Sequence, residues 1–124
     1  MAYPTMEESG AMVFRFPGSP EAMADHPLGF RAPTAECPLA DALDVIVVPA
    51  IAIDPTGQRI GYGAGFYDRA LRARPGSLPI GVAYDFQLIP EVPATSEDVA
   101  VQWIVTDCRV LRASQAAALV PATP

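Results

Sequence analysis

Three glycines at alternate positions, Gly61, Gly63 and Gly65, follow an apolar run over residues 44–53. A loop that leaves a parallel strand and enters a helix presents unpaired N–H groups and the positive end of the helix dipole. Glycines let phosphate oxygens approach those groups closely, so the pattern predicts an anion site. The same glycines would also suit a tight turn. They match neither the dinucleotide fingerprint nor a P-loop, because no Gly-Lys-Ser/Thr follows.

Two aspartates could complete a metal site beside this loop. Asp68 would otherwise be a favourable first-turn charge or a partner for Arg72. An acid beside an anion site is better explained by a cation between them, and Mg²⁺ bound by one or two carboxylates and nucleotide phosphates fits. Asp98 precedes a predicted strand, where a plain turn or edge position is the alternative. We expect both carboxylates to converge near the glycine loop, at carboxyl-end loops of one parallel sheet.

The elements that must position these residues follow from the apolar pattern. Residues 44–53 predict a central strand buried on both faces, and residues 78–84 and 99–106 predict two more strands. Residues 66–74 predict a helix that Pro75-Gly76 ends. Strand, helix and strand in this order predict a parallel α/β unit with a right-handed crossover.

The flanking segments carry weaker signals. Residues 10–16 alternate like an outer strand, and residues 19–25 predict a short helix with Ser19 as cap and Glu21 in its first turn. Residues 27–41 are interrupted by proline and predict a loop, and we expect the alanine-rich end after residue 109 to be helical. The predicted fold is α/β, a mainly parallel sheet flanked by helices in a Rossmann-like three-layer arrangement, with residues 1–124 as one domain.

Composition narrows the class of protein. The chain has 124 residues, 51% of them hydrophobic, and a net charge of -6. Its eight basic residues are all arginine and are scattered, so we expect no nucleic-acid partner. Cys37 and Cys108 form no CxxC pair and predict free thiols. Neither a leader-like N-terminus nor an apolar run of membrane length is present, so we expect a soluble, cytoplasmic protein without a membrane partner.

The central segment resembles the signature of the 5-formyltetrahydrofolate cyclo-ligase (methenyltetrahydrofolate synthetase) family. The segment is "DVIVVPAIAIDPTGQRIGYGAGFYDRAL". Upstream, "MVFRF" and "HPLGFRAPTAECP" look like a strand and a Glu-Pro loop of that family. Downstream, "PIGVAYDFQLIPEVPATSEDVAVQWIVTD" is similar to its Gly-x-Ala-Tyr-x-x-Gln and His-Asp segments. The resemblance covers nearly the whole chain.

The resemblance implies an ATP- and Mg²⁺-dependent ligase of one-carbon metabolism that converts 5-formyltetrahydrofolate to 5,10-methenyltetrahydrofolate. It assigns Arg59 and Tyr67 to catalysis, Asp68 and Asp98 to Mg²⁺, and residues 62–66 to the formyl end of the folate as well as to ATP. The ATP-binding residues that it implies are Arg59, Ile60, Gly61, Tyr62, Gly63, Ala64, Gly65, Phe66 and Tyr67.

The sequence also departs from the family pattern. Met1 falls where the family is already at its second strand, so we expect no counterpart of the N-terminal lysine and arginine residues that grip ATP. Ala32 replaces a glutamate, Ile53 a phenylalanine and Glu97 a histidine. Three hypotheses therefore stand: a cyclo-ligase, a truncated paralogue that keeps a phosphate or folate site without turnover, and an unrelated α/β nucleotide-binding module. Uncovered apolar sheet would favour self-association.

Overall fold

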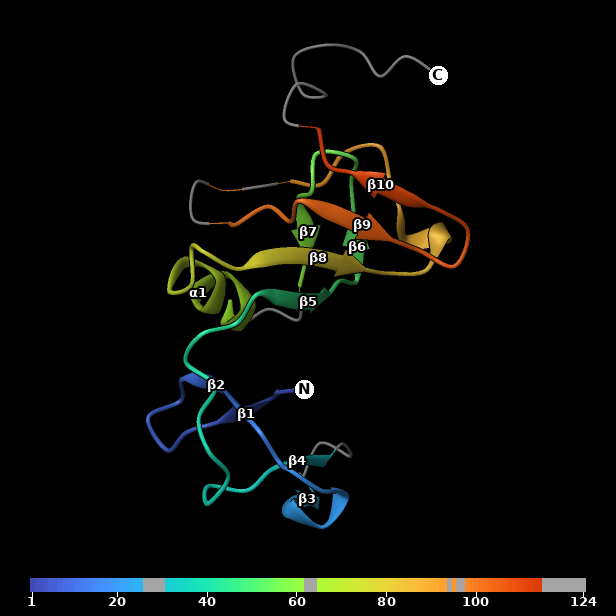
Figure 1. Cartoon of the computed structure of the whole chain (residues 1–124). Helices are drawn as coiled ribbons and strands as arrows, with labels where there is room; N and C mark the ends of the chain where they lie inside the picture. Colours follow the sequence, from blue (N-terminus) through green and yellow to red (C-terminus); the bar gives the residue numbers. More distant parts are fainter. Residues whose placement is uncertain (26–30, 62–64, 94, 96–97, 115–124) are drawn as a thin grey trace. The chain divides into compact units, whose positions relative to one another are not determined.

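The computed structural model describes residues 1–25, 31–61, 65–93, 95 and 98–114. The chain divides into two compact units, Met1–Leu43 and Asp44–Pro124, and each is described by itself (Figure 1). That residues 1–124 form one domain stays a prediction. Within the described residues, no helix is both long enough and apolar enough to cross a membrane.

The first unit contains two antiparallel strand pairs. β1 (Tyr3–Met6) pairs with β2 (Met12–Arg15), which confirms the strand predicted over residues 10–16. β3 (Met23–Asp25) pairs with β4 (Arg31–Pro33), which lies inside the segment predicted as loop. Phe14 on β2 is buried, and its carbonyl accepts a hydrogen bond from the Ala40 N–H at 2.8 Å.

The helix predicted over residues 19–25 is wrong. Only the 3₁₀ turn η1 (Pro20–Ala22) forms, and Met23 is already extended, with φ -105° and ψ 136°. Ser19 makes no side-chain capping bond. The next three residues gain a complete strand partner in β4, and this pairing prevails over a weak local helix signal.

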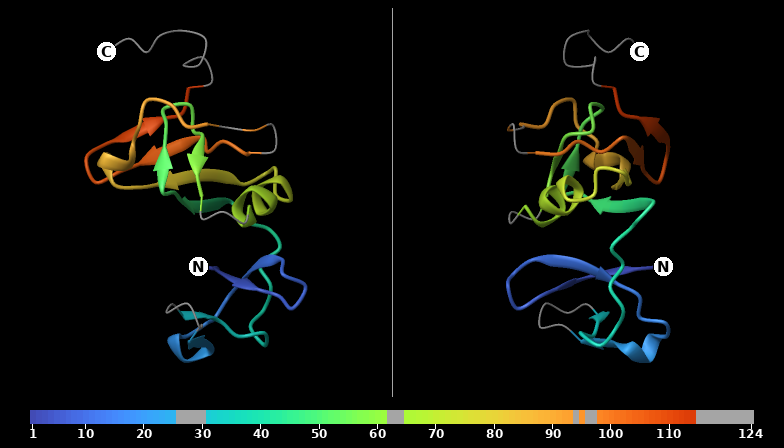
Figure 2. Two further views of the ribbon diagram at one scale, coloured as in Figure 1. Left: turned by 180° about the vertical axis from the view of Figure 1, so that it is seen from behind. Right: turned by 60° about the vertical axis from the view of Figure 1, so that its left-hand side comes forward.

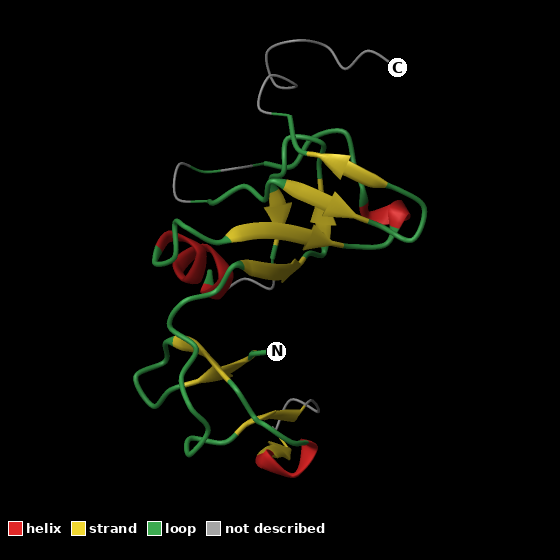
Figure 3. Ribbon diagram, in the orientation of Figure 1, coloured by secondary structure: helices red, strands yellow, loops and turns green. Residues whose placement is uncertain are grey.

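The second unit contains a four-stranded sheet in the order β10-β9-β8-β5 (Figure 3). β5 (Val45–Pro49), β8 (Leu78–Val82) and β9 (Trp103–Val105) run parallel, and β10 (Val110–Arg112) is antiparallel to β9. The mainly parallel sheet is therefore confirmed. The described residues hold a single α-helix, so they form a mixed α/β unit without the predicted helical layers on both faces. The helix expected after residue 109 is wrong over Val110–Arg112, because these residues pair with β9 as a strand. The rest of the alanine-rich end, from residue 115 on, lies outside the described residues.

β5 is an edge strand of this sheet, and the prediction of a central strand buried on both faces is wrong. Ile46 and Val48 are buried, whereas Val45 and Val47 are 47% and 59% exposed. An unbroken apolar run does not reveal which of its faces another element covers. The run also ends early, because after Pro49 the chain turns into a separate hairpin.

That hairpin, β6 (Ala52–Ile53) and β7 (Arg59–Ile60), lies across one face of the sheet (Figure 2). α1 (Phe66–Arg72) follows it and buries Ala70 and Leu71. The predicted helix is thus confirmed, but its regular part ends two residues before Arg74. The turn that follows is closed by the Ser77 hydroxyl, which donates to the carbonyl of Arg74 at 2.8 Å. The hairpin and α1 together bring the glycine segment and its neighbours to one place.

Candidate functional site

Arg59 is the centre of the predicted site. It lies on β7 with its side chain 5% exposed, and its Nη2 atom lies 3.4 Å from Oδ1 of Asp68. Its guanidinium carbon lies 5.7 Å from the centre of the Tyr67 ring, within cation–π range. Nη1 donates a long bond, 3.5 Å, to the carbonyl of Pro49. Strand β7 and the first turn of α1 thus bring together the two residues predicted for catalysis and one predicted for metal.

The hydrogen bonds of this guanidinium are incomplete. Among the described residues, the buried Nε of Arg59 has no hydrogen-bond partner. A buried guanidinium is costly unless its charge and its N–H groups are matched, and Asp68 at 3.4 Å is a loose match. An anionic oxygen at this place would supply the missing acceptor. The geometry therefore supports a phosphate-binding role for Arg59.

Asp68 also reaches the segment before β9. Its Oδ1 accepts a hydrogen bond from the backbone N–H of Val99 at 3.1 Å. The backbone of Asp98 is therefore one residue away from the Asp68 carboxylate. The Asp98 side chain itself accepts from the Thr95 N–H at 2.8 Å and closes a short turn. The structure brings the two segments together but shows no contact between the two carboxylates.

The expectation that Asp98 lies in a carboxyl-end loop of the parallel sheet is wrong. Asp98 precedes β9, so it lies on the amino-terminal side of that strand and not in a carboxyl-end loop. The contact forms because the segment before β9 passes the first turn of α1, where Asp68 stands. The tendency of ligand-binding residues to gather at the carboxyl ends of parallel strands therefore does not account for the position of Asp98.

The two described glycines of the loop have different roles. Gly65 precedes α1 with φ 69° and ψ 20°, the left-handed conformation that favours glycine. A Cβ on Gly61 would lie 2.6 Å from Nη1 of Arg59, so this glycine makes room for the guanidinium. Tyr62, Gly63 and Ala64 lie outside the described residues.

The remaining predicted residues flank this cluster. Ile60 is 41% exposed, and its carbonyl accepts from the Ile51 N–H. Phe66 opens α1, and the guanidinium of Arg69 lies 5.2 Å from its ring centre. Both remain predicted binding residues.

Asp54 is a residue that our sequence analysis missed. It is 2% exposed, and its Oδ1 accepts from the backbone N–H groups of Thr56 at 2.9 Å and Gln58 at 3.2 Å. Its Oδ2 accepts from the Val92 N–H at 2.8 Å. Asp-Pro-Thr-Gly is a typical turn sequence, and this was the available signal. Asp54 thus fixes the turn that leads to Arg59 and ties it to the segment that leads to Asp98.

Asp68 and Asp98 are the residues predicted to bind Mg²⁺. The described residues contain no group of three or more metal-ligating side chains. Mg²⁺ does not require such a group, because it is usually held by one or two carboxylates together with phosphates and water. Asp68, whose side chain is 20% exposed, and Asp98 on the adjoining segment supply hard oxygen donors of this kind. The residues present therefore fit the ion in chemistry and number.

Comparison with known proteins finds relatives that match about half of this chain. A relative from Mycolicibacterium smegmatis, a 5-formyltetrahydrofolate cyclo-ligase, is 48% identical over 67 residues, which are 53% of this chain and 34% of the relative. The cyclo-ligase of Escherichia coli is 40% identical over 70 residues, 55% of this chain and 38% of the relative. The chain thus spans well under half the length of these curated relatives.

Solved structures show the same fold. The NMR structure of Aquifex aeolicus 5,10-methenyltetrahydrofolate synthetase matches with a TM-score of 0.77 and 32% identity, over 90% of this chain and 57% of that one. The Mycoplasma pneumoniae synthetase matches with a TM-score of 0.56 at 22% identity, which supports the fold alone. The family model described as 5-formyltetrahydrofolate cyclo-ligase matches residues 1–107. The chain therefore belongs to the 5-formyltetrahydrofolate cyclo-ligase family.

Proposed function

We propose that this chain carries the phosphate-binding part of an enzyme that closes 5-formyltetrahydrofolate to 5,10-methenyltetrahydrofolate at the expense of ATP. The observation that carries the proposal is the buried Arg59, with Asp68 and Tyr67 beside it and the glycine segment next in sequence. In this reaction ATP phosphorylates the formyl oxygen, N10 attacks the activated carbon, and phosphate leaves. The chemistry needs positioning and charge neutralisation more than a protein nucleophile.

Each side chain has a defined part in this proposal. Arg59 donates to the transferred phosphoryl group, whose oxygens carry the charge in the transition state. Tyr67 lies against the guanidinium and restricts its orientation. The backbone N–H groups of Gly61, Gly63 and Gly65 cradle the remaining phosphate oxygens. The formyl end of the folate faces residues 62–66.

Asp68 and Asp98 would hold Mg²⁺, which when bound offsets the negative charge of the phosphate oxygens. Asp68 also pairs with Arg59, whose Nη2 lies 3.4 Å from its Oδ1. A phosphate arriving at Arg59 would release the Asp68 carboxylate from that pair and leave it available as a ligand. We place this activity in the cytoplasm.

A second candidate is a paralogue that binds nucleotide without turnover. The observation that favours it is that both predicted metal ligands already have internal partners, Asp68 with Arg59 and Asp98 with the Thr95 N–H. Lysine is absent from the sequence, so every cationic side chain here is an arginine. This candidate predicts binding of Mg²⁺-ATP that never leads to methenyltetrahydrofolate.

Calorimetric titration with Mg²⁺-ATP tests the phosphate site that both candidates share. We expect binding to the chain, and we expect Arg59→Gln to weaken it at least about tenfold, or about 1.4 kcal/mol. Arg112→Gln is the matched control, because Arg112 lies exposed on β10. Equal affinities of the two variants would refute the assignment of Arg59.

A further inference from the structure

The two faces of the four-stranded sheet differ in burial. Residues that pair across neighbouring strands project from the same face of a sheet, so the strand register assigns each residue to a face. One face carries Ile46, Val48, Gly81 and Ile104, and all four are buried. A Cβ added to Gly81 would lie 2.7 Å from Cδ1 of Ile53, so the β6–β7 hairpin packs on this face.

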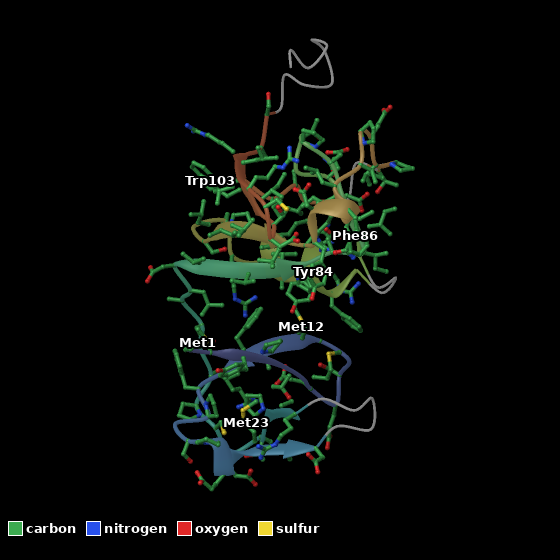
Figure 4. All side chains as sticks on the ribbon, turned by 90° about the vertical axis from the view of Figure 1, so that its right-hand side faces the viewer. Met1, Met12, Met23, Tyr84, Phe86 and Trp103 are labelled. Atoms are coloured by element: carbon green, nitrogen blue, oxygen red, sulfur yellow. The ribbon has the colours of Figure 1, made fainter. Side chains whose placement is uncertain are left out.

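The opposite face is apolar but is not buried. It consists of the first, third and fifth residues of β5 and β8 and of the first and third residues of β9 and β10, and we call this set the open face. None of its members is buried. The row of paired residues Val47, Ile80, Trp103 and Arg112 crosses it from one edge strand to the other. Figure 4 labels Trp103 on this side of the sheet.

The open face exposes large aliphatic side chains next to one another. Val45, Val47, Val82 and Val110 are 47%, 59%, 41% and 64% exposed. A single exposed valine needs no explanation, whereas a contiguous apolar surface marks a place where another surface binds. The half-buried residues between these valines, such as Ile80 and Val105, extend the same apolar surface. The open face is therefore an interaction surface.

The charge pattern favours a second copy of the chain as the occupant. Arg112 is the single charged residue of the open face, and its guanidinium lies 5.9 Å from the centre of the Trp103 ring at the same edge. The chain has a net charge of -6, but no carboxylate belongs to the open face, so two copies can meet there without opposing acids. A two-fold interface joins the same patch on both copies, and a flat patch of β-branched side chains is complementary to itself.

The size of the open face sets the strength of the contact. Strands lie about 4.8 Å apart and rise about 3.3 Å per residue, so this face measures roughly 20 by 17 Å. It is smaller than the surface of about 800 Å² that each partner contributes to a standard stable interface. We therefore expect a reversible dimer whose population depends on protein concentration.

We propose that two copies of this chain associate through their open faces, sheet against sheet, with Val47 and Trp103 inside the interface. Side chains of two stacked sheets interdigitate across a spacing of about 10 Å, which would cover the exposed valines of both copies. This inference goes beyond the proposed function and does not depend on nucleotide binding, because the open face contains none of the residues predicted to bind ATP or Mg²⁺.

Trp103 allows a direct test, because it is the only tryptophan of the chain. Sedimentation velocity of the full chain over about a hundredfold range of concentration should show a reversible equilibrium between monomer and dimer. Over the same range, the fluorescence of Trp103 should shift to the blue and become less accessible to acrylamide as the dimer forms. An edge-to-edge dimer would leave this fluorescence unchanged.

Val47→Lys should weaken the association at least about tenfold, because it places a charge inside an apolar interface. The added lysine makes the net charge less negative, so greater repulsion between the copies cannot explain the loss. Ile51→Lys is the matched control, because Ile51 is 45% exposed and lies outside the sheet. This control should associate like the unchanged chain.

A monomer at every concentration overturns the proposal, including a monomer whose Trp103 is protected throughout by another part of the same chain. A dimer that leaves the fluorescence of Trp103 unchanged also overturns it, because the copies would then join through the edge of β5 or β10. If Val47→Lys fails to fold, Val110→Lys at the 64% exposed position serves instead. Unchanged association in the folded variant has the same meaning. Loss of Mg²⁺-ATP binding in a chain that still dimerises would refute the proposed function alone.

Discussion

Asp68 and Val99 are joined across 31 residues of chain by one hydrogen bond, from the Val99 N–H to Oδ1 of Asp68 at 3.1 Å. The same oxygen lies 3.4 Å from the guanidinium of Arg59. Asp54 makes the corresponding contact with Val92, at 2.8 Å. Two carboxylates, one from the hairpin and one from α1, thus hold the two ends of the segment that carries Asp98. This arrangement explains why a short hairpin can fix several predicted site residues at once.

Removal of the Asp68 side chain should destabilise the protein. Asp68→Ala leaves Arg59 buried without its counter-charge, and we expect a loss of about 2 kcal/mol in the free energy of unfolding. Asp68→Asn keeps a hydrogen-bond acceptor for Val99 and should lose about 1 kcal/mol. Urea unfolding measures both, with Asp41→Ala at an exposed position as control. Equal stability of Asp68→Ala and Asp41→Ala would contradict the role of Asp68.

Gly57 should tolerate no side chain. Its φ is 88°, and a Cβ would lie 2.2 Å from the carbonyl oxygen of Val101. Gly57→Ala must therefore break the contact between the hairpin turn and the segment before β9, at a cost of about 2 kcal/mol or more. Gly76→Ala is the control, because a Cβ there meets nothing within 4 Å. Thermal unfolding should rank Gly57→Ala far below Gly76→Ala, and similar midpoints would count against this packing.

Gly65→Val should abolish nucleotide binding measured by calorimetry. The position has φ 69°, so a β-branched residue would force the start of α1 and the loop before it out of shape. Gly18 provides a matched control with φ 71° in the first unit. Gly18→Val should lose stability through the same backbone strain but keep its affinity for Mg²⁺-ATP. Unchanged affinity in Gly65→Val would show that the glycine serves the turn alone.

The ion pair between Asp85 and Arg109 should make the stability of the folded protein depend measurably on pH. The bonds from Arg109 lower the pKa of Asp85 in the folded protein. A carboxyl with a lowered folded pKa contributes stability above its ordinary pKa, and this stability is lost as the pH falls through the lowered folded value. In Arg109→Met the NMR titration of Asp85 should move up toward the ordinary pKa. No change in that titration would show that Arg109 does not stabilise the charged carboxylate.

The elements that could be predicted are those whose own residues carry the pattern typical of their structure. The helix after Gly65 was predictable because its apolar positions repeat at helical spacing and Pro75-Gly76 ends it. The parallel pairing of β5 with β8 followed from the helix between them. Neither the edge position of β5 nor the exposure of Val45 and Val47 was predictable, because these depend on which other segments pair with the strand and cover its faces. The helix prediction for residues 19–25 was wrong for the same reason, because pairing with the distant strand β4 determines the conformation of Met23–Asp25.

The sequence allowed the residues of the candidate site to be predicted, but not the contacts between them. Asp68 was recognisable from its type and position, and Arg59 and Tyr67 from the resemblance to the cyclo-ligase family. Their mutual distances depend on the β6–β7 hairpin, which the apolar run concealed. Asp54 was overlooked because a turn aspartate gives no sign that it also binds a distant backbone amide. The role of Gly61 as space for a guanidinium likewise requires the folded hairpin.

The most direct test of the central claim is an activity assay on this chain joined to the part of a relative that it does not match. This chain, joined to the part of the Mycolicibacterium smegmatis cyclo-ligase that it does not match, should form methenyltetrahydrofolate from 5-formyltetrahydrofolate, as seen by ultraviolet absorbance, only when ATP is present. The chain alone should form little or none. Asp68→Asn should lower the rate of the joined protein at least about a hundredfold, or about 2.7 kcal/mol, and Asp41→Asn should leave it unchanged. A folded joined protein without ATP-dependent product, or one whose rate is indifferent to Asp68→Asn, would contradict the account.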